Sequence, residues 1–239
     1  MRSAKQSILL GLLGSLSLAS LATPAEAGAL QVDPIKVEIT AERKIASVRV
    51  KNESDRPVTI RGYVLAWSQT NGEDVHAESN AVVVSPPIAT IAPGSVQLVR
   101  VGLRPGSSGP ASYRLMVEEV PEANPGAGVQ VALRLSIPLY AFQKAGAMSD
   151  VNWKASRQPD GTWALDAANT GSGYVRIESK HAREHSGLAF ASEGLLGTVL
   201  PNSSRRFILP KDAPIVDRAR LERITGGVSN DPVQTASKR

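Results

Sequence analysis

One five-residue segment, His181 to His185, carries the spacing of a metal-dependent peptidase. Its letters, HAREH, match H-x-x-E-H, in which two histidines bind one zinc ion from the same helical face and the glutamate acts as general base. The segment has no apolar helical face, and no third zinc ligand is identifiable. We therefore predict a solvated loop that binds no metal, and a zinc peptidase remains the enzymatic alternative.

No other pattern supplies the parts of a catalytic site. The chain has no cysteine, its serines lack the G-x-S-x-G turn that exposes a nucleophile, and only three histidines could act as a base. Gly102, Gly106 and Gly109 lie in a turn with no helix after it, so they do not form a phosphate-binding loop. The sequence predicts a protein that is not an enzyme and needs no cofactor.

Two adjacent acids, Glu118 and Glu119, end an apolar segment just before Val120-Pro121. Adjacent residues of a strand face opposite sides of the sheet, so these two carboxylates cannot share a proton as a catalytic pair would. Two interpretations stay open. Either one acid is buried against a basic residue, for which Arg100 is the natural candidate, or both acids are solvated at the strand end.

The N-terminus has the features of a cleaved secretory signal peptide. Arg2 and Lys5 precede an uncharged run over residues 7–22, and small residues occupy Ala25 and Ala27. The run is shorter than the ~20 residues of a membrane-spanning helix, which disfavours a transmembrane anchor. We expect cleavage after Ala27 and export of residues 28–239, which must be stable without disulfides.

Composition and charge narrow the class of partner. The 239 residues are 42% hydrophobic and 21% charged, as in ordinary globular proteins of one or two domains. The formal net charge of +5 is mild and its basic residues are spread along the chain, which argues against nucleic-acid binding. No later segment is hydrophobic enough for stable membrane insertion, and a few basic side chains could still bind one carboxylate.

Short alternating apolar segments separated by turn residues predict an all-β protein of immunoglobulin-like type. We expect a first domain over residues 28–143, a linker over 144–150 and a second, smaller β-domain over 151–239, with no clear amphipathic helix. The expected strands of the first domain are Leu30–Ile39 with a break at Asp33-Pro34, Ile45–Asn52, Val58–Gln69, Ala81–Ser85, Ile88–Ile91, Val96–Leu103 and Tyr113–Val120. Those of the second domain include Val151–Ala155, Thr162–Asn169, Gly173–Ser179, Ser204–Leu209 and Ala219–Ile224.

The longest alternating segment is GAGVQVALRLSIPLYAF, residues 126–142. A period of two indicates a strand, and its apolar face exceeds what a strand of about 5–6 residues would carry. Such a strand could complete its own sheet and also offer a free edge and apolar side chains to another protein. The apolar positions are Val129, Val131, Leu133, Leu135, Ile137 and Leu139.

Three runs stand in a characteristic order: VVVSPPIATIAPGSVQLVRVGL from Val82, YRLMVEEVP from Tyr113, and VQVALRLSIPLYAF from Val129. With this ordered set the chain resembles the periplasmic pilus chaperones of the chaperone–usher pathway, in the archaic, spore-coat-like branch. The resemblance implies two immunoglobulin-like sandwich domains in an L-shaped or boomerang arrangement. It also implies that the long strand is donated to a pilin subunit to fill the groove left by that subunit's missing strand.

The resemblance further implies roles for individual residues. It assigns Lys36 as one of two basic residues that anchor the subunit's C-terminal carboxylate. The position of the second is Pro138, which carries no charge, so Arg134 is the candidate replacement. Arg100 and Glu119 match part of an inter-domain salt-bridge network. The donated side chains are Val129, Val131, Leu133 and Leu135.

We therefore predict a non-enzymatic periplasmic chaperone whose partners are pilin-like subunits and an outer-membrane usher. Its exposed edge strand would also allow self-association, which the sequence does not decide. The main rival is a secreted two-domain β-sandwich protein for adhesion or carbohydrate binding. That rival needs an exposed aromatic platform, whereas only 4% of this chain is aromatic and its three tryptophans are expected in the core.

Overall fold

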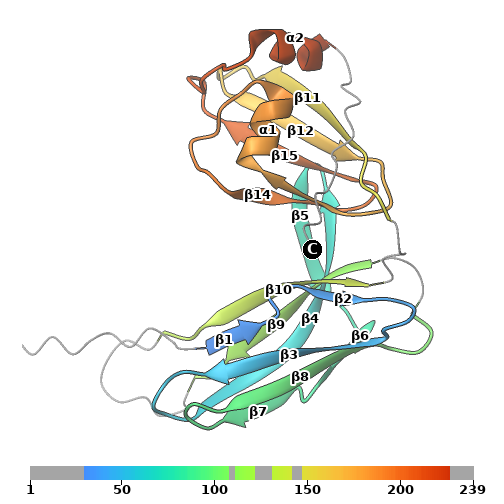
Figure 1. Ribbon diagram of the computed structural model, residues 1–239, viewed down its shortest axis with the longest axis vertical. Helices are drawn as coiled ribbons and strands as arrows, with labels where there is room; N and C mark the ends of the chain where they lie inside the picture. Colours follow the sequence, from blue (N-terminus) through green and yellow to red (C-terminus); the bar gives the residue numbers. More distant parts are fainter. Residues whose placement is uncertain (1–29, 108–110, 122–130, 142–146, 227–239) are drawn as a thin grey trace, which may run out of the picture.

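The computed structural model describes residues 30–107, 111–121, 131–141 and 147–226. Within these ranges it contains two β-rich domains that meet at an angle, the first with ten strands and the second with five strands and two helices (Figure 1). The predicted signal peptide (1–27) and Val129 lie outside the described residues. None of the described helices is long and apolar enough to cross a membrane.

The first domain is a sandwich whose strands change sheets at prolines. The predicted break at Asp33-Pro34 separates β1 (Leu30–Asp33) from β2 (Val37–Ile39), and the two pair in different sheets. A second break at Pro86-Pro87 separates β6 (Val82–Ser85) from β7 (Ile88–Ile91) in the same way. Proline has no backbone N–H to donate to a ladder, so pairing stops there and the chain is able to cross to the facing sheet.

The two sheets differ in size and in what they reach. The smaller has the order β1, β3 (Ile45–Asn52), β8 (Val96–Leu103), β6. The larger has the order β2, β10 (Arg134–Ala141), β9 (Ala111–Glu119), β4 (Val58–Thr70), β5 (Glu73–Glu78), with β7 also paired to β4. The sequence predicted a hairpin turn at Asn71-Gly72 but not β5, which turns β4 into a long hairpin that reaches the second domain (Figure 1).

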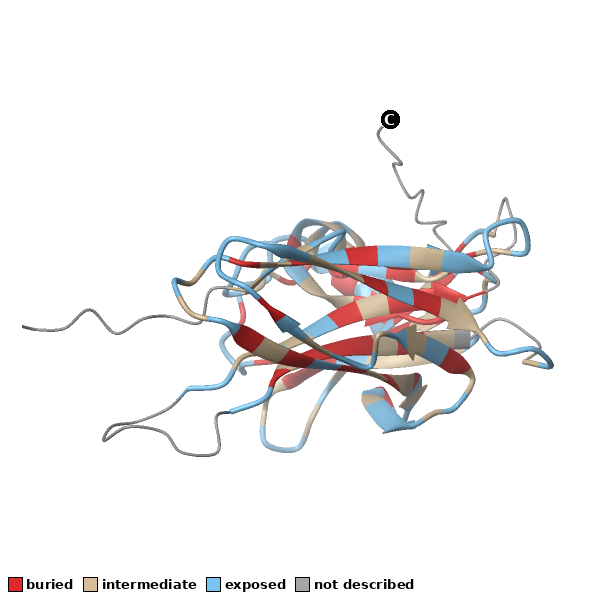
Figure 2. Ribbon diagram, turned by 90° about the horizontal axis from the view of Figure 1, so that it is seen from below, coloured by how far each residue is buried: buried red, intermediate tan, exposed pale blue. Residues whose placement is uncertain are grey.

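Alternate side chains of the two sheets form the core of the first domain. Val48 and Val50 on β3 and Val99 and Val101 on β8 are fully buried against Leu115 and its neighbours on the larger sheet. Figure 2 shows buried and exposed residues alternating along strands of the molecule. The period-two pattern in the sequence therefore encoded which face of each strand is covered.

The second domain packs two sheets and two helices around a core of its own. The core contains buried Trp153, Leu165, Ile177, Leu188 and Ile224. The three-stranded sheet has the order β11 (Val151–Arg157), β12 (Trp163–Asn169), β15 (Ser203–Leu209), and the two-stranded sheet pairs β13 (Val175–Glu178) with β14 (Leu195–Val199). The helices are α1 (Ser179–Ser186) and α2 (Arg218–Gly226).

Both helices correct the sequence prediction. The H-x-x-E-H segment is the helix α1 rather than a loop, because the fully buried Ala182 and a stack of His185 on Trp153 hold one face of it against the domain. The predicted strand Ala219–Ile224 is part of α2. Its buried Leu221 and Ile224 are three residues apart, which is a helical spacing that a period-two interpretation missed.

Candidate functional site

The apolar face of β10 continues past the end of the core that covers it. Leu139 and Ile137 are 0% and 3% exposed inside the first domain. Leu135 is half-buried at the margin of the same core, and Leu133 is also half-buried. Val131 has the same parity and is 67% exposed. The strand face is thus covered at its C-terminal end and increasingly open toward its N-terminal end.

The backbone edge of β10 is also only partly used. One edge pairs with β9 over the whole strand, whereas the other pairs with β2 only from Leu139 to Ala141. The Leu133 carbonyl accepts the N–H of Glu119, so the odd-numbered residues of β10 bond to β9 and the even-numbered ones face the other edge. Arg134 and Ser136 therefore present N–H and carbonyl groups at an edge that no described strand covers, while Pro138 presents a carbonyl alone.

These observations locate the three predicted donor residues that fall in the described part of the chain. Leu135 lies within β10, whereas Val131 and Leu133 precede the strand as it is formed in this chain. All three have the parity of the core residues Ile137 and Leu139. An additional strand at the free edge would therefore meet a continuous apolar face.

Arg134 lies on the opposite face of β10, in a row of charges across three strands. It pairs with Glu118 of β9 at 3.0 Å, and Arg61 of β4 pairs with the same carboxylate at 3.1 Å. These two arginines hold the pKa of Glu118 below its ordinary value. Arg134 thus serves a surface ion pair four residues from Pro138.

Lys36 lies where the two domains meet. Its Nζ is 2.9 Å from the Glu38 carboxylate and donates to the Tyr174 hydroxyl of the second domain at 3.2 Å. The Tyr174 hydroxyl in turn donates to Glu38 at 3.0 Å, and the Tyr174 ring stacks on Tyr140 of β10 with centroids 3.8 Å apart. We call Lys36, Glu38 and Tyr174 the cleft triad.

The electrostatics of the cleft triad favour its charged forms. Partial burial disfavours charge on Lys36 and Glu38, but their mutual hydrogen bonds and those to Tyr174 outweigh it, so the pKa of Lys36 is raised and that of Glu38 is lowered. Burial raises the pKa of Tyr140 to about 12, although the nearby cations Arg114 and Lys36 act in the opposite direction. Burial likewise raises the pKa of Tyr174, so the hydroxyls of Tyr140 and Tyr174 are both neutral at physiological pH.

Arg114 is a candidate binding residue that sequence reasoning missed. It faces Pro138 directly in the β9–β10 register, on the face of the sheet turned toward the second domain. Its guanidinium lies 3.8 Å from the ring centroid of Trp67, and its buried Nε has no hydrogen-bond partner among the described residues. Burial lowers the pKa of Arg114. The available signal was the Tyr-Arg pair that opens YRLMVEEVP, in which Arg114 alternates with the buried Tyr113 and Leu115.

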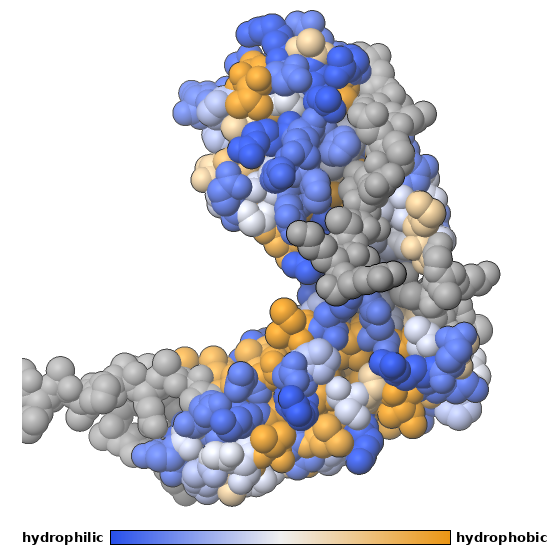
Figure 3. Space-filling view, in the orientation of Figure 1, coloured by the Kyte–Doolittle hydropathy of each residue, from blue (hydrophilic) through white to orange (hydrophobic). Residues whose placement is uncertain are grey.

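A polar joint fixes the β4–β5 hairpin to the second domain. The Gly72 carbonyl accepts the N–H of Arg206 at 2.8 Å, and the Gln69 amide donates to the Thr198 carbonyl at 2.7 Å. Asp74 pairs with Arg205 of β15 and also accepts the indole N–H of Trp67. Figure 3 shows the notch that the bend leaves between the domains, with apolar surface on the first-domain side.

The predicted Arg100–Glu119 pair is replaced by a different one. Glu119 has core-facing parity on β9 and pairs with Arg56 at 3.3 Å, while its other carboxylate oxygen accepts the Leu133 N–H at 3.4 Å. Arg100 alternates with the buried Val99 and Val101 on β8 and so points away from the core, on the smaller sheet. The two side chains therefore leave different faces of the sandwich. The buried-acid interpretation holds for Glu119 with Arg56 as its partner.

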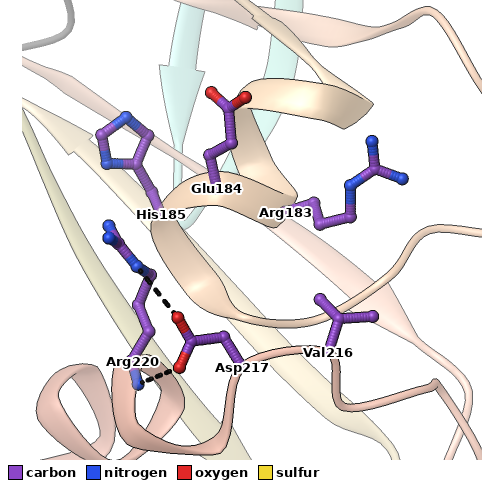
Figure 4. A pocket seen from close by; sticks show the side chains of 6 residues that line it. All are labelled: Arg183, Glu184, His185, Val216, Asp217 and Arg220. Carbon is purple, nitrogen blue, oxygen red and sulfur yellow. Dashed lines mark hydrogen bonds and ion pairs between the residues drawn. The ribbon is translucent and has the colours of Figure 1, made fainter.

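The H-x-x-E-H helix lines an open pocket of about 770 Å³ in the second domain. Its lining residues are Arg183, Glu184, His185, Val216, Asp217 and Arg220. Figure 4 shows that Glu184 and His185 leave the helix in different directions and that Arg220 pairs with Asp217, at 3.7 Å. Within the described residues, no group of three or more His, Cys, Asp or Glu side chains is placed to hold a metal ion.

Comparison with known proteins finds a family model that matches the first domain. Residues 29–141 match the family model described as "Pili and flagellar-assembly chaperone, PapD N-terminal domain". A comparison with curated protein sequences finds no match.

Solved structures share the fold of both domains. The complex of CsuC and the tip adhesion subunit CsuE from archaic Csu pili of Acinetobacter baumannii includes a chain 24% identical at a TM-score of 0.62, covering 76% of this chain and 88% of that one. The E. coli chaperone DraB is 17% identical at 0.53, covering 77% and 87%. The Salmonella enterica SafA pilin–SafB chaperone complex gives 12% identity at 0.55, covering 77% and 86%.

Proposed function

We propose that this chain, which belongs to the pili and flagellar-assembly chaperones through residues 29–141, binds pilin-like subunits. It would do so by inserting the apolar side chains at the N-terminal end of β10 into the subunit. The subunit's incomplete sheet would pair with the free edge of β10, and the donor side chains Val131, Leu133 and Leu135 would fill its groove. Val129 would extend the same row. The chaperone then delivers the subunit to an outer-membrane usher.

The observation that carries this proposal is the burial gradient along one face of β10. A strand that served only its own domain would have no reason to continue its apolar alternation to Val131, which is 67% exposed. Exposed apolar side chains beside an unpaired strand edge favour association with another strand. Pairing at the edge also fixes the register, since a one-residue slip would turn every donor side chain away from the groove.

Lys36 and Arg114 together are the proposed anchor for the subunit's C-terminal carboxylate. Lys36 offers a point charge in the cleft between the domains, and Arg114 lies opposite Pro138, where a second cation was expected from β10. The buried Arg114 Nε lacks a hydrogen-bond partner in the described chain, so a bound carboxylate could satisfy it. Arg134 is less suited, because it lies four residues from Pro138 on β10, about 13 Å along the strand at about 3.3 Å per residue.

The proposal is tested by placing a charge on the donor face. Val131→Arg and Leu133→Arg should each abolish capture of the pilin subunit co-expressed from a neighbouring gene, because a buried arginine would have no partner in the subunit's groove. Both residues lie outside the formed strands, so the variants should fold normally. Val96→Arg is the matched control, since Val96 is 53% exposed on the smaller sheet. Capture that survives both donor variants would refute the proposal.

The anchor is tested separately. Lys36→Ala and Arg114→Met should weaken capture, whereas Arg134→Ala should leave it within about twofold of the wild type, because only a surface ion pair is lost. Unchanged capture by Lys36→Ala would remove Lys36 from the anchor. Equal losses in all three variants would mean that general positive charge attracts the subunit.

The proposed compartment is the periplasm, reached by the predicted signal peptide. Adhesion or carbohydrate binding is less well supported, because Trp67, Trp153 and Trp163 are all buried and cannot form an exposed aromatic platform. Detection of the mature protein in a periplasmic fraction, with its N-terminus at Gly28, tests the export step.

A further inference from the structure

The lysine assigned to the subunit's carboxylate already holds a carboxylate of its own chain. The Lys36 Nζ is 2.9 Å from Glu38 Oε1, which also accepts the Tyr174 hydroxyl at 3.0 Å. Lys36 donates to that hydroxyl at 3.2 Å, so the three groups form a closed ring of contacts. Glu38 lies in β2 and Lys36 directly precedes that strand, and the side chains of these two residues meet on one side of the chain.

Burial on the other side of β2 directs this pair into the cleft. Val37 and Ile39 are buried in the core of the first domain, so Lys36 and Glu38 project toward the second domain. Tyr174 meets them from that domain and stacks on Tyr140. The Glu38 carboxylate therefore occupies the meeting point of the two domains.

We propose that Glu38 is an internal carboxylate that occupies Lys36 until the C-terminal carboxylate of a bound subunit displaces it. This inference rests on the proposed function, because it assumes that Lys36 receives that carboxylate. The incoming group has the same chemistry as Glu38: it is an anion that accepts hydrogen bonds from an ammonium and a phenol.

Displacement follows from the electrostatics of the cleft. Two carboxylates at one ammonium repel each other, so a second one binds Lys36 less well while Glu38 remains in place. Both members of the present pair are nearly half exposed, and ion pairs of that exposure contribute little stability and are readily exchanged. Glu38 therefore lowers the affinity of the anchor for a carboxylate without closing it.

Replacement of Glu38 by another carboxylate at Lys36 would also change the contact that Tyr174 makes between the domains. Tyr174 donates to Glu38, so its hydroxyl must find a new acceptor once Glu38 moves away. The incoming carboxylate can supply one. The ring of Tyr174, stacked on Tyr140, is therefore a natural spectroscopic reporter of anchor occupancy.

The test compares two glutamates that each pair with the lysine two residues before them. Glu38→Gln removes the charge but keeps an oxygen that accepts from Tyr174, so the fold is retained. Glu53→Gln is the matched control, because Glu53 pairs with Lys51 at 2.7 Å with the same two-residue spacing and similar exposure, just after the end of β3 and outside the cleft. Each full-length mature protein is titrated with N-acetyl-trialanine bearing a free carboxylate and with its C-terminal amide, and the tyrosine ring signals are followed by NMR.

We expect Glu38→Gln to bind the free-carboxylate peptide about 2- to 5-fold more tightly than the wild type, the range set by removal of one half-exposed competing pair. The amide should bind both proteins equally, and Glu53→Gln should match the wild type. Weaker binding by Glu38→Gln would mean that Glu38 only positions Lys36, and unchanged binding would mean that it does not compete. Either result overturns the inference, as would an equal gain for the amide.

Failure of the proposed function gives a different pattern. If Val131→Arg and Leu133→Arg both capture the co-expressed subunit as well as the wild type does, donor-strand binding is refuted whatever the peptides show. If the wild type captures the subunit and Glu38→Gln captures it no better, only the role of Glu38 is refuted.

Discussion

Truncation of two side chains on the same face of β10 should separate binding from stability. Val131 and Ile137 share parity on this segment, but the first is 67% exposed and the second 3% exposed. Val131→Ala should weaken subunit binding and leave folding intact. Ile137→Ala should destabilise the first domain because it leaves a cavity in a close-packed core.

The magnitudes follow from the exposed fractions. Val131→Ala removes two methyl groups worth about 0.8 kcal/mol each when they are fully buried. About two-thirds of that burial is still available to a partner, which gives about 1 kcal/mol, or about a 5-fold increase in the dissociation constant of the subunit. Ile137→Ala should lower the free energy of unfolding by about 2–5 kcal/mol. Val131→Ala should change it by less than about 0.5 kcal/mol.

Two measurements on each variant check these values: urea unfolding of the free protein, and the dissociation constant of the co-expressed subunit's complex. Val96→Ala serves as control, since it removes the same two methyl groups from a residue 53% exposed on the other sheet and should alter neither quantity strongly.

The reasoning would be refuted if Val131→Ala destabilised the free protein as much as Ile137→Ala does, because Val131 would then belong to the chaperone's own core. It would equally be refuted if Val131→Ala and Val96→Ala bound the subunit with the same affinity as the wild type.

Three further predictions concern the joint and the base of the donor segment. Gly72→Ala should lower the free energy of unfolding by about 1–2 kcal/mol and widen the inter-domain angle measured by small-angle scattering. The reason is that Gly72 has φ +84° and an added Cβ would lie 2.7 Å from a side-chain carbon of β15. Gly94→Ala is the control, because Gly94 has φ +66° and open space around it and therefore reports the backbone strain without the contact. Burial opposes charge on Asp74, but the hydrogen bonds that its carboxylate accepts outweigh burial and lower its pKa in the folded protein. The charged carboxylate therefore stabilises the fold fully above about pH 4, and this contribution is lost as the pH falls through the lower folded-state pKa. The difference in unfolding free energy between the wild type and Asp74→Asn should shrink over that acidic range. Glu119→Gln should lower the free energy of unfolding in urea by about 1–2 kcal/mol. It should also speed hydrogen exchange of the Leu133 N–H, which donates to the Glu119 carboxylate. Unchanged exchange would show that this hydrogen bond does not protect Leu133.

Much of the fold followed from local pattern. The strands around Val48, Val99 and Leu115 were predicted from alternation because a half-buried sheet needs apolar residues at every second position. The proline at position 34 marked the break in the first strand. The helices α1 and α2 were missed because each is short and buries only a few residues, so neither leaves a long 3.6-residue period in the sequence.

The ion pairs were predicted less well than the strands. Glu119 was assigned to Arg100, but its partner is Arg56, because the facing side chains of a sandwich depend on which sheet and which face each strand occupies. Arg114 was overlooked for the same reason. Its position opposite Pro138 depends on the β9–β10 register, which no spacing within one strand reveals.

The sequence by itself determined the alternating face of residues 129–139, the break at Pro34 and the absence of disulfides, since each depends on neighbouring residues or on composition. Only the tertiary structure decided where that face leaves the core, between Ile137 and Val131, because burial depends on what the other sheet covers. It also brought Glu38 to Lys36 beneath Tyr174, a residue 138 positions away from Lys36 in the chain. Contacts between domains depend on the shapes and side chains of two folded surfaces, and the residues that form each surface are scattered along the sequence.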